Sequence, residues 1–177
     1  MIPSLSLRPQ RSNPVFAGGI SRIASAFILI AALLAGVSLV RADMRTAQDA
    51  LDREDYRTAL KEFLAMAEAG DGLAQSSLGV MHERGMGTPR DYGEALYWFT
   101  KSAEQGHSFG QFNLGSMYFL GQGVVQDRIE GCKWFSLALQ QGNAQALYNL
   151  QMCGKYLTEA ERSDYNRRVI EWQAKRK

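Results

Sequence analysis

The chain has 177 residues, of which 20 are Lys or Arg and 18 are Asp or Glu, and its net charge at pH 7 is +2. Four of the basic residues and none of the acidic ones lie in residues 1–42, so the remainder carries 16 basic and 18 acidic side chains, a net charge of −2. The slight basic balance therefore belongs to the first segment and does not indicate nucleic-acid binding.

Residues 1–42 have the pattern of an export signal. Arginines are followed by an uncharged, mostly aliphatic segment at residues 23–40, and Val40-Arg41-Ala42 ends in a small residue of the kind that precedes a cleavage site. This segment also reaches the lower limit of a membrane-spanning helix, about 17–25 residues. Two alternatives remain open. Cleavage after Ala42 gives a periplasmic or secreted protein, whereas retention gives an inner-membrane anchor with the rest of the chain outside the cytoplasm.

The remainder, residues 43–177, repeats with a period of 36 residues. Residues 78–82 (LGVMH) return as residues 114–118 (LGSMY), and Trp98-Phe99 returns as Trp134-Phe135, without a gap. A fixed period of this length indicates a solenoid of stacked units, in which no unit buries its apolar face alone. The sequence therefore predicts an all-α fold built from antiparallel helix pairs.

Two full units, residues 71–106 and 107–142, each predict an A helix, a glycine loop and a B helix. Gly79 and Gly115 lie in the middle of the predicted A helices. Glycine there costs about 1 kcal/mol relative to alanine. Because this cost recurs at the same position of both units, we expect a partner helix to approach closely at each glycine.

Helix ends are also marked in both units. Gly85 and Gly121 are expected to end the A helices in the left-handed conformation. Asp91 and Asp127 are expected to begin the B helices, and each is followed three residues later by a glutamate, as in a capping box. The A and B helices of one unit thus have predicted boundaries.

Weaker copies of the unit flank these two. Residues 44–70 predict an N-terminal helix pair, and residues 143–177 predict a terminal pair. A capping box at Thr158 and Glu161 begins the last helix, whose arginines, Arg168 among them, are expected to face solvent. We interpret the basic end, residues 175–177, as a solvated helix terminus that complements the helix dipole.

Cys132 and Cys153 lie at similar distances on either side of the turn at Gly142, and on antiparallel helices this places them at nearly the same height. Export would permit a disulfide between them. The other interpretation is two buried thiols that pack as small apolar side chains. The sequence leaves both open.

These motifs resemble the Sel-1-like repeat, a relative of the tetratricopeptide repeat that is common in exported bacterial proteins. Residues 110–142 carry its L-G-x-M-Y, G-x-G-V, aspartate and tryptophan positions, and residues 74–106 carry them with His82 in place of tyrosine and Thr88 in place of valine. The resemblance implies a right-handed superhelix of antiparallel helix pairs. It also implies a scaffold for protein–protein interaction.

Catalytic and metal-binding motifs are not found in the sequence. His82 occupies the tyrosine position, and His107 occupies a position where short polar residues cap the A helices. We therefore expect no enzyme activity, no cofactor and no metal site. Cysteine-rich exported relatives of the repeat have been linked to β-lactam hydrolysis, which leaves a β-lactam-binding hydrolase as a distant alternative. This chain lacks their cysteine pair in each unit.

A column of short polar residues, Ser77, Asn113 and Asn149, recurs once per A helix. Asparagine donates and accepts hydrogen bonds at once, so this column could hold the backbone of an extended peptide. Phe119, beside Tyr118, could add an apolar anchor. The other interpretation is that these residues hold neighbouring helices or simply face water.

The sequence thus predicts an exported scaffold that binds a protein, a peptide or another component of the cell envelope. An inner-membrane-anchored periplasmic regulator of a signalling or assembly complex is the alternative. We expect a monomer that contacts a membrane only through an uncleaved N-terminal segment.

Overall fold

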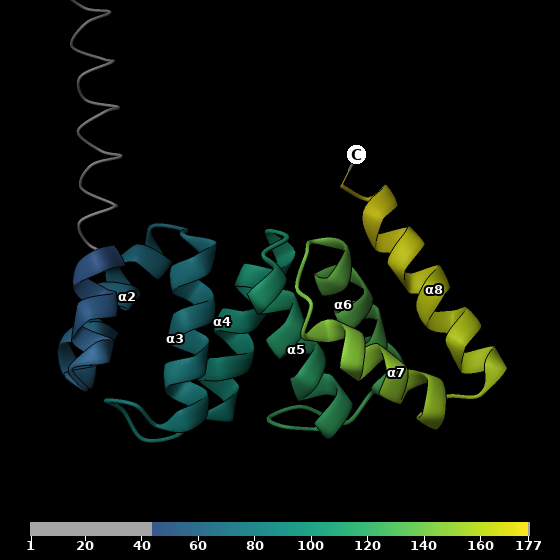
Figure 1. Cartoon of the computed structure of the whole chain (residues 1–177), viewed down its shortest axis with the longest axis horizontal. Helices are drawn as coiled ribbons and strands as arrows, with labels where there is room; N and C mark the ends of the chain where they lie inside the picture. Colours follow the sequence, from purple (N-terminus) through teal and green to yellow (C-terminus); the bar gives the residue numbers. More distant parts are fainter. Residues whose placement is uncertain (1–43, 177) are drawn as a thin grey trace, which may run out of the picture. The chain divides into compact units, whose positions relative to one another are not determined.

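The structure is a computed structural model that describes residues 44–176. Residues 44–52 are helical, and no strand occurs within the described range. The predicted export signal at residues 1–42 lies outside the described residues. The remaining helices are α2 (Tyr56–Glu68), α3 (Gly72–Arg84), α4 (Tyr92–Glu104), α5 (Ser108–Leu120), α6 (Arg128–Gln140), α7 (Ala146–Tyr156) and α8 (Glu159–Ala174), seen in Figure 1.

Aspartates begin the helices as predicted. The side chain of Asp91 accepts hydrogen bonds from the backbone N–H groups of Gly93 and Glu94, and Asp127 accepts one from Glu130. Such caps satisfy backbone donors that a helix start leaves without partners. At the other end, Gly85 and Gly121 adopt φ angles of 72° and 74°. The predicted left-handed ends of the A helices are therefore confirmed.

From α2 to α7, successive helices pack against one another, and α3 also contacts α5 directly. The A helices α3 and α5 thus stack on each other across one repeat. A β-carbon built on Gly79 would lie 2.6 Å from the ring of Phe99, and one built on Gly115 would lie 2.9 Å from the ring of Phe135. The predicted close approach at both glycines is confirmed, because each B-helix phenylalanine occupies the space of the missing side chain.

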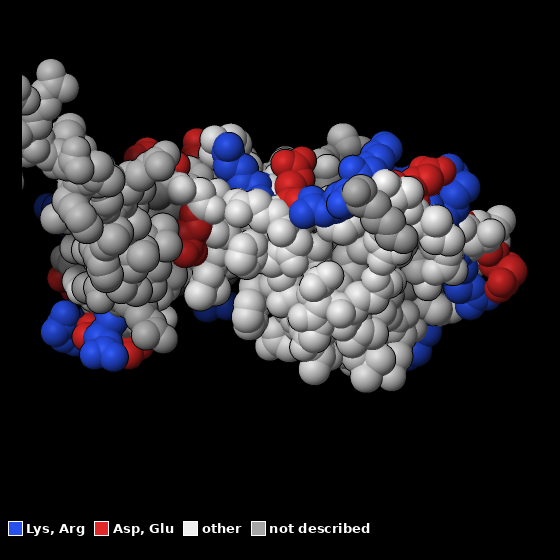
Figure 2. All heavy atoms as spheres, turned by 90° about the horizontal axis from the view of Figure 1, so that it is seen from above, with Lys and Arg blue, Asp and Glu red and all other residues white. Residues whose placement is uncertain are grey.

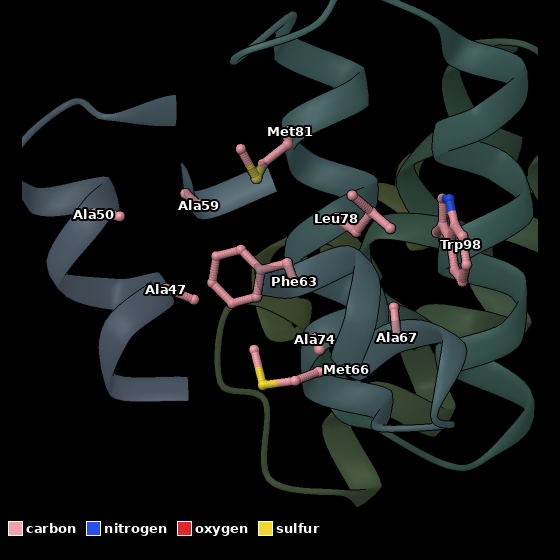
Figure 3. Close-up of a cluster of buried hydrophobic side chains, with 10 residues drawn as sticks. All are labelled: Ala47, Ala50, Ala59, Phe63, Met66, Ala67, Ala74, Leu78, Met81 and Trp98. Carbon is pink, nitrogen blue, oxygen red and sulfur yellow. The ribbon is translucent and has the colours of Figure 1, made fainter. Parts of the chain in front are cut away.

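The apolar core continues along the stack as three neighbouring clusters. The first cluster joins residues 44–52 to α2, α3 and α4, and Figure 3 shows Phe63 among Ala47, Met66 and Met81. Phe63 is only 1% exposed. Burial of the N-terminal pair against the first full unit explains why a degraded copy of the repeat remains folded, since a single unit has too little core.

The last helix, α8, lies against α6 rather than facing solvent on all sides. Its predicted capping box between Thr158 and Glu161 is present. The prediction that Arg168 faces solvent is wrong. Its guanidinium contacts the carboxylates of Asp127 and Glu130 at 3.2 and 3.1 Å, at the start of α6. Charge-assisted hydrogen bonds to these two carboxylates hold the arginine against the stack.

Cys132 of α6 and Cys153 of α7 are joined as a disulfide, with a Cα–Cα distance of 6.0 Å. Both residues are buried, in the cluster that also contains Phe135 and Ala146. The sequence left open either a disulfide or two buried thiols, and the structure contains the disulfide. It fixes the last A helix to the B helix that precedes it.

Within residues 44–176, the architecture is thus a helical-repeat solenoid, as predicted. No helix in this part of the chain is long and apolar enough to cross a membrane.

Candidate functional site

Two hollows lie side by side along the A helices. The first is formed between α3 and α5, has a volume of about 210 Å³, and is lined by Leu73, Ser76, Ser77, Val80, Phe109 and Asn113. The second lies between α5 and α7, has a volume of about 150 Å³, and is lined by Ser116, Phe119, Leu120, Phe135, Asn149 and Met152. We call the surface that contains both hollows the A-helix face.

The predicted polar column lies on this face. Ser77 and Asn113 line the first hollow together, and Asn149 lines the second. All three are partly exposed. Each hollow therefore combines an asparagine amide with aliphatic and aromatic walls, which is the combination that orients a ligand and buries its apolar groups.

Phe119 and Tyr118 point to different sides of α5. Phe119 lines the second hollow and packs against Phe135, with ring centroids 5.9 Å apart. Tyr118 lines a separate hollow with residues of the loop before α6, the start of α6, the end of α7 and the start of α8. Burial raises the pKa of Tyr118, and the charges of Glu130 and Asp127 raise it further. Adjacent residues on a helix are rotated by about 100°, so the structure does not bring this predicted pair together.

The A-helix face is nearly free of charge at its centre. α5 contains no Asp, Glu, Lys or Arg between Ser108 and Leu120. Yet Phe109 is 55% exposed and Leu120 is 61% exposed. In the view of Figure 2, many charged side chains lie along the upper edge, beside a broad area of uncharged residues. Exposed apolar side chains that gather on an uncharged helix are typical of an interaction site.

Sequence reasoning named Phe119 but missed the other apolar side chains of this surface. Leu73 and Phe109 occupy one position of consecutive units and are 44% and 55% exposed. The signal was available, since both lie four residues before the polar column, on the same side of the helix. The prediction followed the short polar residues and did not include Leu73 and Phe109.

His107 has a packing role. The imidazole of His107 fills the space beside Gly72, where a built β-carbon would lie 2.0 Å from the ring. His107 makes no side-chain capping bond, so the predicted capping role is wrong for this residue; Asp71 does cap, accepting from Ala74 at 2.8 Å. Among residues 44–176, no group of His, Cys, Asp and Glu side chains is placed to hold a metal ion.

The repeated helix pairs and their continuous A-helix face define a helical-repeat protein. The Sel1 repeat profile matches residues 72–107 and 108–143. The chain belongs to the Sel1 repeat family, whose members are typically protein-interaction scaffolds.

Two solved structures are similar to the chain. One is the Sel1 repeat protein from Oxalobacter formigenes, at 30% identity and a TM-score of 0.57, covering 63% of this chain and 87% of that one. The other is c5321, a protective antigen of uropathogenic Escherichia coli strains that displays an SLR fold, at 26% identity and a TM-score of 0.71. That match covers 75% of this chain but only 29% of c5321. No curated protein sequence matches the chain.

Proposed function

We propose that the chain is an exported, non-enzymatic scaffold whose A-helix face binds an extended segment of another protein or component of the cell envelope. The observation that carries the proposal is the pair of adjacent hollows, each with an apolar wall and an asparagine. Neighbouring packed helices lie about 8–10 Å apart. An extended chain in the polyproline II conformation has three residues per turn and advances about 3.1 Å per residue. Side chains three residues apart therefore point the same way, about 9 Å apart, and would reach both hollows.

Export is supported by the pattern of residues 1–42 and by the disulfide, because disulfides persist in oxidising compartments. Sequencing the N-terminus of the protein recovered from cells tests this point. A first residue of Asp43 supports a cleaved, periplasmic or secreted protein. An intact N-terminus in the membrane fraction supports the alternative of an inner-membrane-anchored regulator.

A photocrosslinking experiment tests the A-helix face. Benzoylphenylalanine in place of Phe109 puts the reactive group at the mouth of the first hollow, and the same residue at Ile170, which is 66% exposed on α8, is the control. We expect an adduct of defined mass from position 109 in intact cells and none from position 170. Equal labelling from both positions would contradict a specific face.

Replacement of Asn113 and Asn149 by alanine should reduce the amount of that adduct without unfolding the domain. Asn166→Ala on the exposed side of α8 is the matched control. An unchanged adduct in the double variant would show that the asparagines do not hold the partner.

A further inference from the structure

Another hollow lies away from the A-helix face, where α2, α3 and α4 meet. It has a volume of about 600 Å³, and its walls include Trp98, Tyr97, Lys101, Gln75 and Glu68. We call it the Trp98 hollow. The backbone at Gly70 borders it, and a β-carbon built on Gly70 would meet no atom of residues 44–176 within 4 Å.

One repeat later, the same arrangement of residues recurs. Six of the residues that line the Trp98 hollow are identical 36 positions on, the pairs being Ala67 and Ala103, Glu68 and Glu104, Gly70 and Gly106, Gln75 and Gln111, Trp98 and Trp134, and Gln105 and Gln141. The amides behave alike as well. Gln75 donates to the carbonyl oxygen of Ala67, and Gln111 donates to that of Ala103. The second set therefore forms an equivalent site, the Trp134 site.

The Trp134 site is filled by the chain's own α8. Trp172 packs edge-on against Trp134, with ring centroids 5.7 Å apart. One turn later, Arg176 donates to the backbone carbonyl oxygen of Glu104 and lies over the Trp172 ring. A β-carbon built on Gly106 would lie 3.8 Å from this guanidinium, whereas the space at Gly70 is open. The two sites thus share most of their lining residues, but only the Trp134 site is covered by α8.

Differences between the two sites favour a basic ligand at the vacant one. Glu104 stands where the Trp134 site has Gln140, which accepts a hydrogen bond from Gln173 of α8 at 2.5 Å. With Glu68, this places two carboxylates at the Trp98 hollow. The opposing cation, Lys101, lies 5.1 Å above the ring of Tyr97.

We propose that the Trp98 hollow is a docking site for a helix of a partner protein that carries an indole and, one turn later, a guanidinium. This is the pair that α8 and the residues directly after it present to the Trp134 site. The chain's own α8 cannot supply it, because Trp172 and Arg176 are already engaged at the Trp134 site. The proposal concerns a surface separate from the A-helix face, so either can fail without the other.

A peptide with the sequence of residues 158–177, fluorescently labelled, is the probe, and its anisotropy is followed as the full chain is added. We expect saturable binding that a Trp172→Ala peptide loses. In the protein, Glu68→Arg should weaken binding about tenfold and Lys101→Glu should tighten it, because a guanidinium is placed among these charges. Asp49→Arg, an exposed site on the helix at residues 44–52, is the charge-matched control and should leave the affinity unchanged.

The peptide could also displace α8 from the Trp134 site, and crosslinking separates the two outcomes. A photoreactive group at the peptide position of Gln173 should label residues 97–105, which border the Trp98 hollow. Labelling of residues 133–141 instead would overturn the proposal. So would the absence of saturable binding at a peptide concentration of about 1 mM, or an affinity that neither Glu68→Arg nor Lys101→Glu changes.

Discussion

Replacement of Gly79 by alanine tests the close packing between A and B helices. The new methyl carbon would lie 2.6 Å from the ring of Phe99, which is fully buried and therefore has little freedom to move. Overpacking of a core costs roughly 1–3 kcal/mol, and a contact this short belongs at the upper end. The gain in helix propensity offsets about 1 kcal/mol. We expect a net loss of about 2 kcal/mol in the free energy of unfolding.

Gly154→Ala is the matched control, because Gly154 lies inside α7 and a β-carbon there would meet no atom of the described part of the chain within 4 Å. Only the propensity term remains, so this variant should gain up to about 1 kcal/mol. Urea unfolding followed by far-UV circular dichroism measures both, and the midpoints of the two variants should differ by roughly 1 M or more. A Gly79→Ala protein as stable as the parent would refute the packing argument.

Three further predictions concern bonds described above. Reduction of the disulfide should lower the free energy of unfolding by about 3 kcal/mol, since the bond spans 21 residues; a Cys153→Ser variant should show no response to reductant. Arg168→Gln should cost about 1 kcal/mol and speed amide hydrogen exchange in α8, and unchanged exchange there would argue against anchoring by this residue. Hydrogen bonds from Thr58 and Thr158 hold the pKa values of Asp55 and Glu161 below their usual range, so their stabilisation is present above about pH 4 and is lost as the pH falls through the lower folded values. Urea midpoints measured down the acid range should therefore decline, and less steeply in Glu161→Gln.

Local rules explain which parts of the fold could be predicted from the sequence. Gly85 and Gly121 end helices because only glycine adopts positive φ without strain, and Asp91 and Asp127 begin them because a carboxylate satisfies free backbone donors. Both rules depend on a few neighbouring residues. The 36-residue period repeats these start and end signals along the chain, so the order and the boundaries of the helices could be predicted.

Features that depend on how distant segments meet could not be predicted in this way. Arg168 turns inward because it contacts carboxylates at the start of α6. These carboxylates lie 38 residues or more before it in the chain, so local sequence patterns do not reveal the contact. Its helix is strongly polar, with Val169 as its buried residue, so periodicity did not mark an inner side. The candidate site was predicted in part: the polar column was found, but the apolar walls beside it come from pairs of A helices.

The contacts of α8 also bear on how many repeats such a chain can have. Arg168 contacts the aspartate and glutamate at the start of α6, and Trp172 contacts its tryptophan. Asp91, Glu94 and Trp98 occupy the same positions of α4. The terminal helix thus contacts residues that both full units carry. A repeat unit could therefore be lost or gained during evolution, and the same terminal helix would still pack on the last unit.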